Sequence, residues 1–273
     1  MYRPYWQLER RPFDDFADPS FYYPGQGHQG ALLKLRYAVE NGQPAALLAG
    51  SPGVGKTLLV STLLARLPER FAPRVQMVFP QMPPDQLLAY LAAELGASQP
   101  SEATGTIEQS VRRIEQSLAE NARAGRHTVV VIDEAHLLAD AGSLELMRLL
   151  LNFAGPAGGA MTLLLVGQPA ILPQLDRIPS LEERLGVKCL LRPLTSDETA
   201  GYVTHRLEAA GAKQAIFEDD ALDALHQLSR GVPRHINRLA DLALLIGFAE
   251  ERTTIAASQI EAVSEELVTV APE

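Results

Sequence analysis

The segment GSPGVGKT, residues 50–57, is the feature that most constrains how this chain can fold. It fits the pattern G-x-x-x-x-G-K-[ST] at every fixed position. The apolar run before it, 45–48, predicts a strand, and the run after it, 58–60, is compatible with a helix. A glycine-rich loop between a strand and a helix lets successive backbone N–H groups converge on phosphate oxygens. This context favours a phosphate-binding loop over a chance glycine turn.

Two side chains at the end of this loop have chemistry that suits a nucleoside triphosphate. Lys56 supplies a mobile cation for the β- and γ-phosphates, and the Thr57 hydroxyl can complete the shell of a Mg²⁺ ion. We therefore expect the chain to bind ATP with Mg²⁺. The loop residues expected to contact the nucleotide are Gly50, Ser51, Pro52, Gly53, Val54, Gly55, Lys56, Thr57 and Leu58.

An acidic pair, Asp133 and Glu134, directly follows the β-branched apolar run 129–132, which is typical of a strand covered on both faces. Asp133 can hold Mg²⁺ through water, and Glu134 can orient and deprotonate an attacking water. An acidic turn after a strand is a common structural feature, but the phosphate loop makes the hydrolytic interpretation the stronger one. The letters DEAH also occur in helicases, yet 273 residues leave no room for a second motor domain, so His136 is weak evidence for helicase activity.

Three further polar residues are candidates for the same chemistry. Gln168 closes the buried strand expected at 161–166, where its amide can reach the γ-phosphate or the water, although a polar strand end explains it too. Arg234 lies in the first turn of a helix that begins near Pro233, where the helix dipole disfavours a cation, and this indicates an anionic partner. Arg184 precedes the last strand and, taken alone, resembles a surface arginine in a salt bridge.

The order of the elements predicts an α/β fold followed by an all-helical part. Strands alternating with helices imply a parallel sheet with helices on both faces. We expect an aromatic and proline-rich segment over 1–30, packed on another part of the protein, a nucleotide-binding core over 31–194 and a helical domain over 195–273. The expected strands are 45–48, 75–79, 129–132, 161–166 and 187–191; the expected helices are 28–39, 56–67, 85–95, 106–122, 143–153, 196–210, 219–229, 233–250 and 257–268, with a surface loop at 98–105.

Composition limits the kinds of partner and the cellular compartment that suit this chain. A formal charge of −9 disfavours a general nucleic-acid surface, although a local basic patch on an oligomer remains compatible with it. Cys189 is the single cysteine, which excludes an intrachain disulfide and fits a reducing compartment. No apolar run approaches the roughly 20 residues that span a bilayer. The chain therefore reads as a soluble cytoplasmic protein without a signal peptide.

Several segments together resemble the GspA/ExeA-type AAA+ ATPases of bacterial secretion systems, over nearly the whole length. The first and last of these segments are the specific ones. They are YWQL (5–8) with Pro12-Phe13, GSPGVGKT (50–57), VIDEAH (131–136), LVGQP (165–169), RPL (192–194) and SRGVPRHINRL (229–239).

The resemblance implies a P-loop NTPase of the AAA+, ASCE type, with a three-layer core carrying Walker A and Walker B motifs and a C-terminal helical lid. It implies Gln168 as sensor 1, Arg234 as sensor 2 and Arg184 as an arginine finger that reaches a neighbouring subunit's nucleotide. A finger in trans makes hydrolysis depend on assembly into a ring or filament. The implied function is an ATP-hydrolysing oligomeric switch, with a protein partner, in assembly of a secretion or cell-envelope machine.

The chain departs from that family in two respects. Relatives usually carry an asparagine before the proline that ends the second strand, where it restrains the catalytic glutamate; here Phe79 precedes Pro80. Gln81 can substitute for it, and slow or regulated hydrolysis fits this change. Full-length relatives also continue into a membrane anchor and a peptidoglycan-binding module, whereas this sequence ends at Glu273, as a soluble relative or a piece of a longer protein would.

Two other functions compete with this one. An ATP-dependent DNA-binding regulator of the transposition type would need basic residues, and those of helix 106–122 and the turn after it are interspersed with Glu115 and Glu120, which favours a solvated face. A small-molecule kinase is disfavoured, because Glu134 and the segment 231–234 suit water activation and lid sensing better than an acceptor site. Which surface the aromatic segment covers, a nucleotide base or a neighbouring subunit, stays open. The basic residues of helix 106–122 and of the turn after it are Arg112, Arg113, Arg123 and Arg126.

Overall fold

The computed structural model describes residues 1–14, 16–96, 106–138, 141–153 and 161–269. The chain divides into two compact units. The first comprises Met1–Gln29, Ser51–Thr62 and Arg192–Glu273, and the second comprises Gly30–Gly50 and Leu63–Leu191. The surface loop expected at 98–105 lies outside the described residues.

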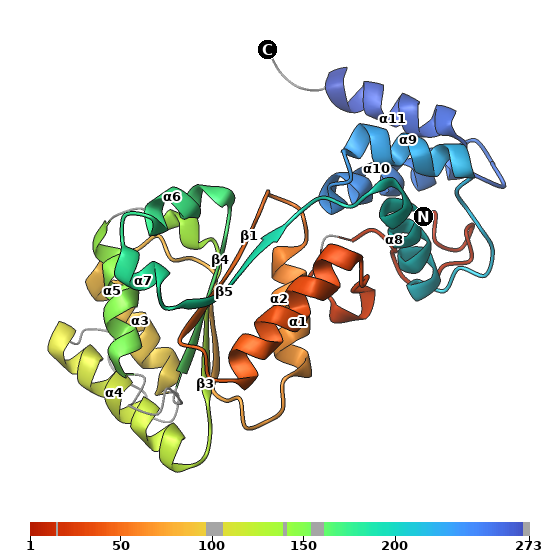
Figure 1. The fold of residues 1–273 in the computed structure, drawn as a ribbon. Coiled ribbons are helices and arrows are strands. Elements are labelled where there is room, and N and C mark those ends of the chain that lie inside the picture. Colours follow the sequence, from red (N-terminus) through yellow and green to blue (C-terminus); the bar gives the residue numbers. More distant parts are fainter. Residues whose placement is uncertain (15, 97–105, 139–140, 154–160, 270–273) are drawn as a thin grey trace. The chain divides into compact units, whose positions relative to one another are not determined.

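The second unit is built on a parallel sheet (Figure 1). In the described residues its strands are β1 (Ala45–Gly50), β2 (Arg74–Met77), β3 (Thr128–Ile132), β4 (Met161–Gly167) and β5 (Leu185–Leu191), in the order β2-β3-β4-β1-β5. Every residue of the three inner strands β3, β4 and β1 is buried. Their near-continuous apolar sequences follow from this, because a central strand of a parallel sheet is covered on both faces.

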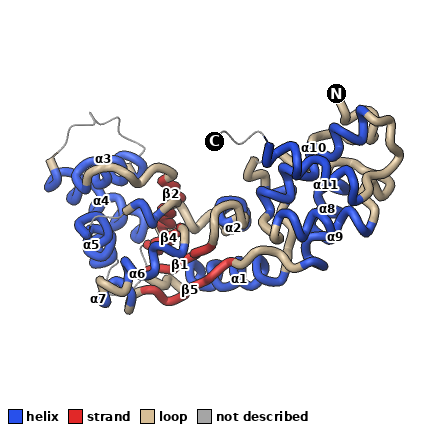
Figure 2. Tube along the Cα trace, turned by 90° about the horizontal axis from the view of Figure 1, so that it is seen from above, coloured by secondary structure: helices blue, strands red, loops and turns tan. Residues whose placement is uncertain are grey.

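Helices cover the sheet on both sides (Figures 1 and 2). On one face α3 (Pro84–Leu95), α4 (Ile107–Arg123) and α5 (Ala141–Leu150) share one apolar core with the strands. On the other face lie residues 30–40 of α1 (Gln26–Glu40). Helix α4 begins with a capping box, in which Thr106 and Gln109 each accept a hydrogen bond from the other's backbone N–H. Two short helices, α6 (Leu172–Leu175) and α7 (Pro179–Glu182), lead from β4 to β5.

The first unit joins the C-terminal helices to the N-terminal aromatic segment. Its helices α8 (Ser196–Ala209), α9 (Asp219–Ser229), α10 (Pro233–Ala249) and α11 (Ala257–Thr269) share a core with Tyr2, Trp6, Phe13 and Phe21. The Trp6 indole N–H donates to the Leu244 carbonyl at 2.9 Å. The buried guanidinium of Arg206 donates to the Pro12 and Asp14 carbonyls and stacks over the Phe21 ring. Buried apolar side chains and hydrogen bonds from side chains to backbone carbonyls therefore hold the segment on the helices.

These elements confirm the predicted fold class, a parallel α/β sheet followed by helices, with two local corrections. The strand expected at 75–79 ends at Met77, because β3, its pairing partner, ends opposite it at Ile132. Val78 and Phe79 are consequently exposed. The helix expected at 143–153 begins at Ala141 and gives way to a 3₁₀ turn at Leu151–Phe153. Among the described helices, none has the length and apolar character needed to cross a bilayer.

Removing the Trp6 side chain should destabilise the first unit strongly. The indole is 7% exposed and its N–H is bonded, so Trp6→Ala should cost about 3–5 kcal/mol of unfolding free energy. Phe16→Ala is the matched control in the same segment, since Phe16 is 78% exposed and should lose almost nothing. Chemical denaturation followed by circular dichroism measures both; equal losses would show that the segment does not anchor through this core.

Candidate functional site

The phosphate-binding loop has a backbone that only glycine adopts readily at two positions. It lies between the end of β1 and the start of α2 (Lys56–Arg66), and φ is 78° at Gly53 and 93° at Gly55. Such left-handed conformations are strained for residues with a Cβ. A Cβ at Gly53 would also lie 2.9 Å from the Cβ of Arg234. The two glycines therefore let the loop take this conformation without strain or a clash with Arg234.

Lys56 and Thr57 open helix α2 directly after the loop. The Lys56 side chain is buried, and its ammonium donates to the Ser51 carbonyl at 3.1 Å, so the charge lies back across the loop. Thr57 is exposed at the next position. A buried cation held by the loop backbone, with a helix N-terminus beside it, is an arrangement that stabilises phosphate groups.

The N-terminus of α10 contacts the same loop within the first unit. The backbone N–H of Arg234 donates to the Gly53 carbonyl at 3.2 Å, while the Arg234 side chain is exposed. Gly231 has φ of 68°, and its carbonyl accepts from the Leu194 N–H at 2.8 Å. A Cβ at Gly231 would overlap the Leu194 carbonyl oxygen. The sequence singled out Arg234, and the structure places its backbone against the loop.

An aromatic cluster beside the loop was not identified as a site from the sequence. Gly55 and Leu58 border a cavity of about 30 Å³ whose other lining residues are Tyr22, Tyr23, His28, Leu194, Tyr202 and Pro233. The His28 ring Nε2 lies 2.8 Å from the Val54 carbonyl, and because a carbonyl only accepts, Nε2 carries the proton. Burial lowers the pKa of His28, so the ring is neutral near pH 7. The one sequence feature that points to this cluster is the aromatic run 21–23, just ahead of the first helix.

The acidic pair lies at the end of β3 in the second unit. Asp133 is buried; its N–H donates to the Met77 carbonyl at 2.8 Å, and its Oδ1 accepts from the Glu134 N–H at 2.9 Å. Glu134 has a left-handed backbone, with φ of 52° and ψ of 35°. For a residue with a Cβ, this conformation costs of the order of 1–3 kcal/mol and is typical of functional sites. It leaves the Glu134 side chain 41% exposed.

Gln168, at the end of β4, lies beside His136, which the sequence offered only as weak evidence for helicase activity. Its backbone N–H donates to His136 Nδ1 at 3.3 Å, and the same Nδ1 is 3.4 Å from Glu134 Oε2. Gly167 permits this approach, because a Cβ there would lie 3.1 Å from the His136 backbone nitrogen. The spacing between the residues carries no signal that would predict this contact.

Arg184 is partly buried and bonded to neutral oxygens. Its guanidinium donates to the Asn152 side-chain oxygen at 2.7 Å and to the Arg148 carbonyl at 3.3 Å. In the part of the chain that the structure describes, it makes no ion pair with a carboxylate, so its charge is not neutralised by one. The surface salt bridge considered from the sequence is therefore not what holds it.

Parallel pairing brings the ends of three strands to one edge of the sheet. β1 leads at Gly50 into the phosphate-binding loop, β3 leads into Asp133 and β4 leads into Gln168. In open α/β sheets, ligands bind outside the carboxyl ends of the strands. In the described ranges no three His, Cys, Asp or Glu side chains gather into a metal site.

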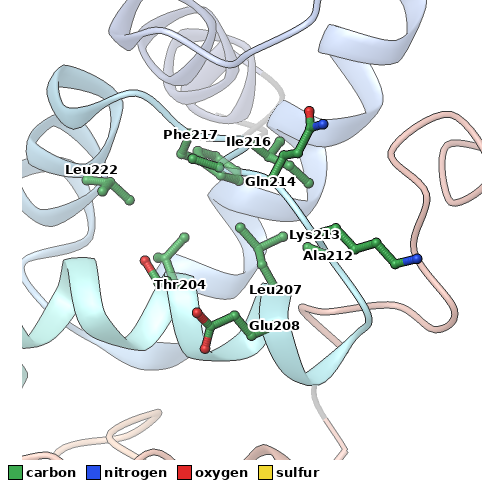
Figure 3. Close-up of a pocket in the computed structure, with 11 residues that line it drawn as sticks. Thr204, Leu207, Glu208, Ala212, Lys213, Gln214, Ile216, Phe217 and Leu222 are labelled. Carbon is green, nitrogen blue, oxygen red and sulfur yellow. The ribbon is translucent and has the colours of Figure 1, made fainter.

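A second cavity in the first unit does not have these features. It encloses about 260 Å³ between α8 and the segment around Lys213, with Leu207, Phe217 and Leu222 in its wall (Figure 3). Lys213 extends away from the apolar side chains, and Glu208 is the one carboxylate of the lining (Figure 3). The lining of this cavity contains neither the glycine loop nor the residues that follow β3 and β4.

The neutral His28 should make stability depend on pH. Because burial lowers its folded pKa below the ordinary 6.5, opposed by the Val54 hydrogen bond and Glu198, the folded state binds fewer protons than the unfolded state. The stability that the neutral ring contributes is fully present above pH 6.5 and is lost as pH falls from there through the lowered folded pKa. Its slope is at most about 1.4 kcal/mol per pH unit. Thermal unfolding at pH 7.5 and 5.5 should show a smaller pH difference for His28→Gln than for the wild type; equal differences would contradict this.

Comparison with known proteins agrees with this geometry. The family model of the AAA domain matches residues 39–175. General secretion pathway protein A of Aeromonas hydrophila is 35% identical over 253 residues, which are 91% of this chain and 45% of that protein. The chain thus spans less than half the length of this relative.

Two solved structures show the same fold at low identity. The ORC2 protein of Aeropyrum pernix, in ADPNP–ADP complexes, has a TM-score of 0.73 at 17% identity and covers 97% of this chain and 73% of its own. The RuvB Holliday junction branch migration motor of Thermotoga maritima has a TM-score of 0.61 at 22% identity. The match covers 89% of this chain and 70% of the RuvB chain. The predicted resemblance is confirmed: the chain belongs to the AAA domain family of P-loop NTPases and is related to general secretion pathway protein A.

Proposed function

We propose that this protein binds ATP with Mg²⁺, hydrolyses it, and acts as an oligomeric switch in assembly of a secretion or cell-envelope machine. The observation that supports the proposal is that β1, β3 and β4 end at one edge of a parallel sheet, and that the chain continues from these ends into the glycine loop, the Asp133–Glu134 pair and Gln168. P-loop NTPases that hydrolyse their nucleotide combine these groups. A relative solved in ADPNP–ADP complexes supports adenine nucleotide as the ligand.

In this mechanism the chain orients the reactants and stabilises charge. The loop N–H groups and the Lys56 ammonium take the phosphate oxygens, and Thr57 with Asp133 would hold Mg²⁺, which neutralises the developing charge. A water oxygen attacks the γ-phosphorus as the bond to the bridging β-oxygen breaks. Glu134 accepts the proton of that water, and the Gln168 amide orients the water or the γ-phosphate. The products are ADP and inorganic phosphate.

The aromatic cluster in the first unit is the proposed site for the nucleotide base. Its side chains adjoin Gly55, and its cavity of about 30 Å³ has room for water but not for a purine. The side chains of Tyr22, Tyr23 and Leu194 must therefore move to admit a purine. Aromatic faces suit stacking on a base, and His28 retains its proton on Nε2 for the Val54 carbonyl.

Two arginines extend the proposal to assembly. Arg234 is proposed to sense the γ-phosphate, since its backbone bonds the phosphate loop. Arg184 is proposed to act in trans on a neighbour's nucleotide, because no ion pair in the described residues neutralises it. The secretion role and a cytoplasmic location rest on the relationship to general secretion pathway protein A, of which the chain covers 45%.

DNA binding of the transposition type is the alternative, and RuvB, which has this fold, is a branch migration motor. The charge of −9 and the pairing of Arg112 with Glu108 at 2.8 Å argue against a basic DNA surface on α4. Binding of duplex DNA that requires ATP and falls steeply with salt would favour the alternative.

Glu134→Gln should bind ATP as the wild type does and lose about 10²–10⁴-fold in turnover, because the proton acceptor is removed while the phosphate cradle is kept. Lys56→Ala, which removes the cation from the loop, is the control that should lose binding itself. Equilibrium binding of a fluorescent ATP analogue and release of inorganic phosphate measure the two effects. Full turnover in Glu134→Gln would assign the base elsewhere.

Arg184→Ala should lose turnover alone and recover part of it when mixed with Lys56→Ala. In a mixed oligomer the Lys56→Ala subunit brings an intact Arg184 to the nucleotide of its Arg184→Ala neighbour. Phosphate release is measured across mixing ratios at constant total protein. Phosphate release that stays near zero at every mixing ratio would contradict the action of Arg184 in trans.

A further inference from the structure

A single ring nitrogen lies between the catalytic carboxylate and the backbone of the sensor residue. His136 Nδ1 is 3.4 Å from Glu134 Oε2 and 3.3 Å from the Gln168 backbone nitrogen. All three residues belong to the second unit and to the strand ends of β3 and β4. His136 has no role in the mechanism described so far.

The two neighbours of Nδ1 can each bond it only in a different protonation state of that nitrogen. The carboxylate of Glu134 accepts hydrogen bonds, so Nδ1 must carry a proton to bond it. The N–H of Gln168 donates, so Nδ1 must offer its lone pair to bond that group. One nitrogen cannot do both at once, and the ring therefore has two bonding states, one with each neighbour.

Burial restricts the ring more than the carboxylate. The His136 side chain is 12% exposed, whereas that of Glu134 is 41% exposed. Gly167 leaves the space in which the two strand ends meet. A buried ring beside a more exposed carboxylate restricts the directions in which that carboxylate can point.

We infer that His136 is a positioning residue that orients Glu134 toward the attacking water and couples that orientation to the backbone at Gln168. The inference rests on the proposed ATP hydrolysis and assigns His136 a part in it. When Nδ1 bonds Glu134, the carboxylate is held; when Nδ1 bonds the Gln168 N–H, the carboxylate is released. A displacement of Gln168 thus changes the geometry of the base.

The test compares substitutions at His136 that differ in where they place a polar group. His136→Ala should lower kcat about tenfold, the effect of losing one hydrogen bond to a charged group, and leave ATP affinity and thermal stability unchanged. His136→Asn puts an amide where Nδ1 was and should keep most of the turnover. His136→Gln puts its amide at the position of Nε2 and should behave as the alanine variant does.

Gln174→Ala is the matched structural control, because it removes the bond to the His136 carbonyl and leaves the ring nitrogen in place. It should keep wild-type turnover. Loss of turnover equal to that of His136→Ala would show that the loop conformation, and not the ring nitrogen, is responsible, and would overturn the inference. A parallel loss of ATP affinity in His136→Ala would do the same.

A spectroscopic signature tests the contact independently of turnover. In protein labelled with ¹⁵N-histidine, the Nδ1 resonance of His136, assigned by its absence in His136→Asn, should shift in Glu134→Gln. An unshifted resonance would overturn the contact. If the wild type releases phosphate but His136→Ala is unaffected, this inference fails alone; if the wild type releases none under any condition of assembly, both this inference and the proposed function fail.

Discussion

Parallel pairing of β1, β3 and β4 is the constraint on which the rest of this structure depends. The strands run in one direction, so their carboxyl ends share an edge, and whatever residue follows each strand is delivered there. The glycine loop, Asp133 and Gln168 come from positions far apart in the chain. Every residue of β1, β3 and β4 is buried, and this packing fixes where each strand ends. Site geometry is here a consequence of sheet packing.

Left-handed backbone and close approach occur at the ends of β3 and β4, where Glu134 takes a left-handed conformation despite its Cβ and Gly167 lets the two strand ends meet. In the first unit, Gly53 and Gly55 take left-handed conformations in the loop. A sheet with buried central strands can hold such local costs, each of order 1–3 kcal/mol, because its core overdetermines the backbone. Phe79, after the end of β2, is exposed, and His136 Nδ1 lies 3.4 Å from the Glu134 carboxylate.

The first unit shows how the N-terminal aromatic segment joins the phosphate loop to the C-terminal helices. Trp6 and Arg206 fasten the segment to the helical core, and the chain then passes through Tyr22 and Tyr23 to His28, which bonds the loop at Val54. Arg234 bonds the neighbouring Gly53 from the start of α10. Loop, aromatic segment and C-terminal helices therefore meet at adjacent residues, where a change at one affects the others.

The sequence by itself determined the glycine loop, the acidic pair, the parallel α/β class and the approximate positions of the longer helices and of the strands, because these depend on contiguous residues and short periodicities. It put the end of β2 two residues too late, at 79 in place of Met77, since a strand's end depends on its partner. Only the tertiary structure decided that His136 meets Gln168, 32 residues away, that His28 meets Val54, 26 residues away, and that Arg206 holds Pro12, 194 residues away. Such contacts depend on how strand ends and helices pack, and no local pattern along the chain encodes them.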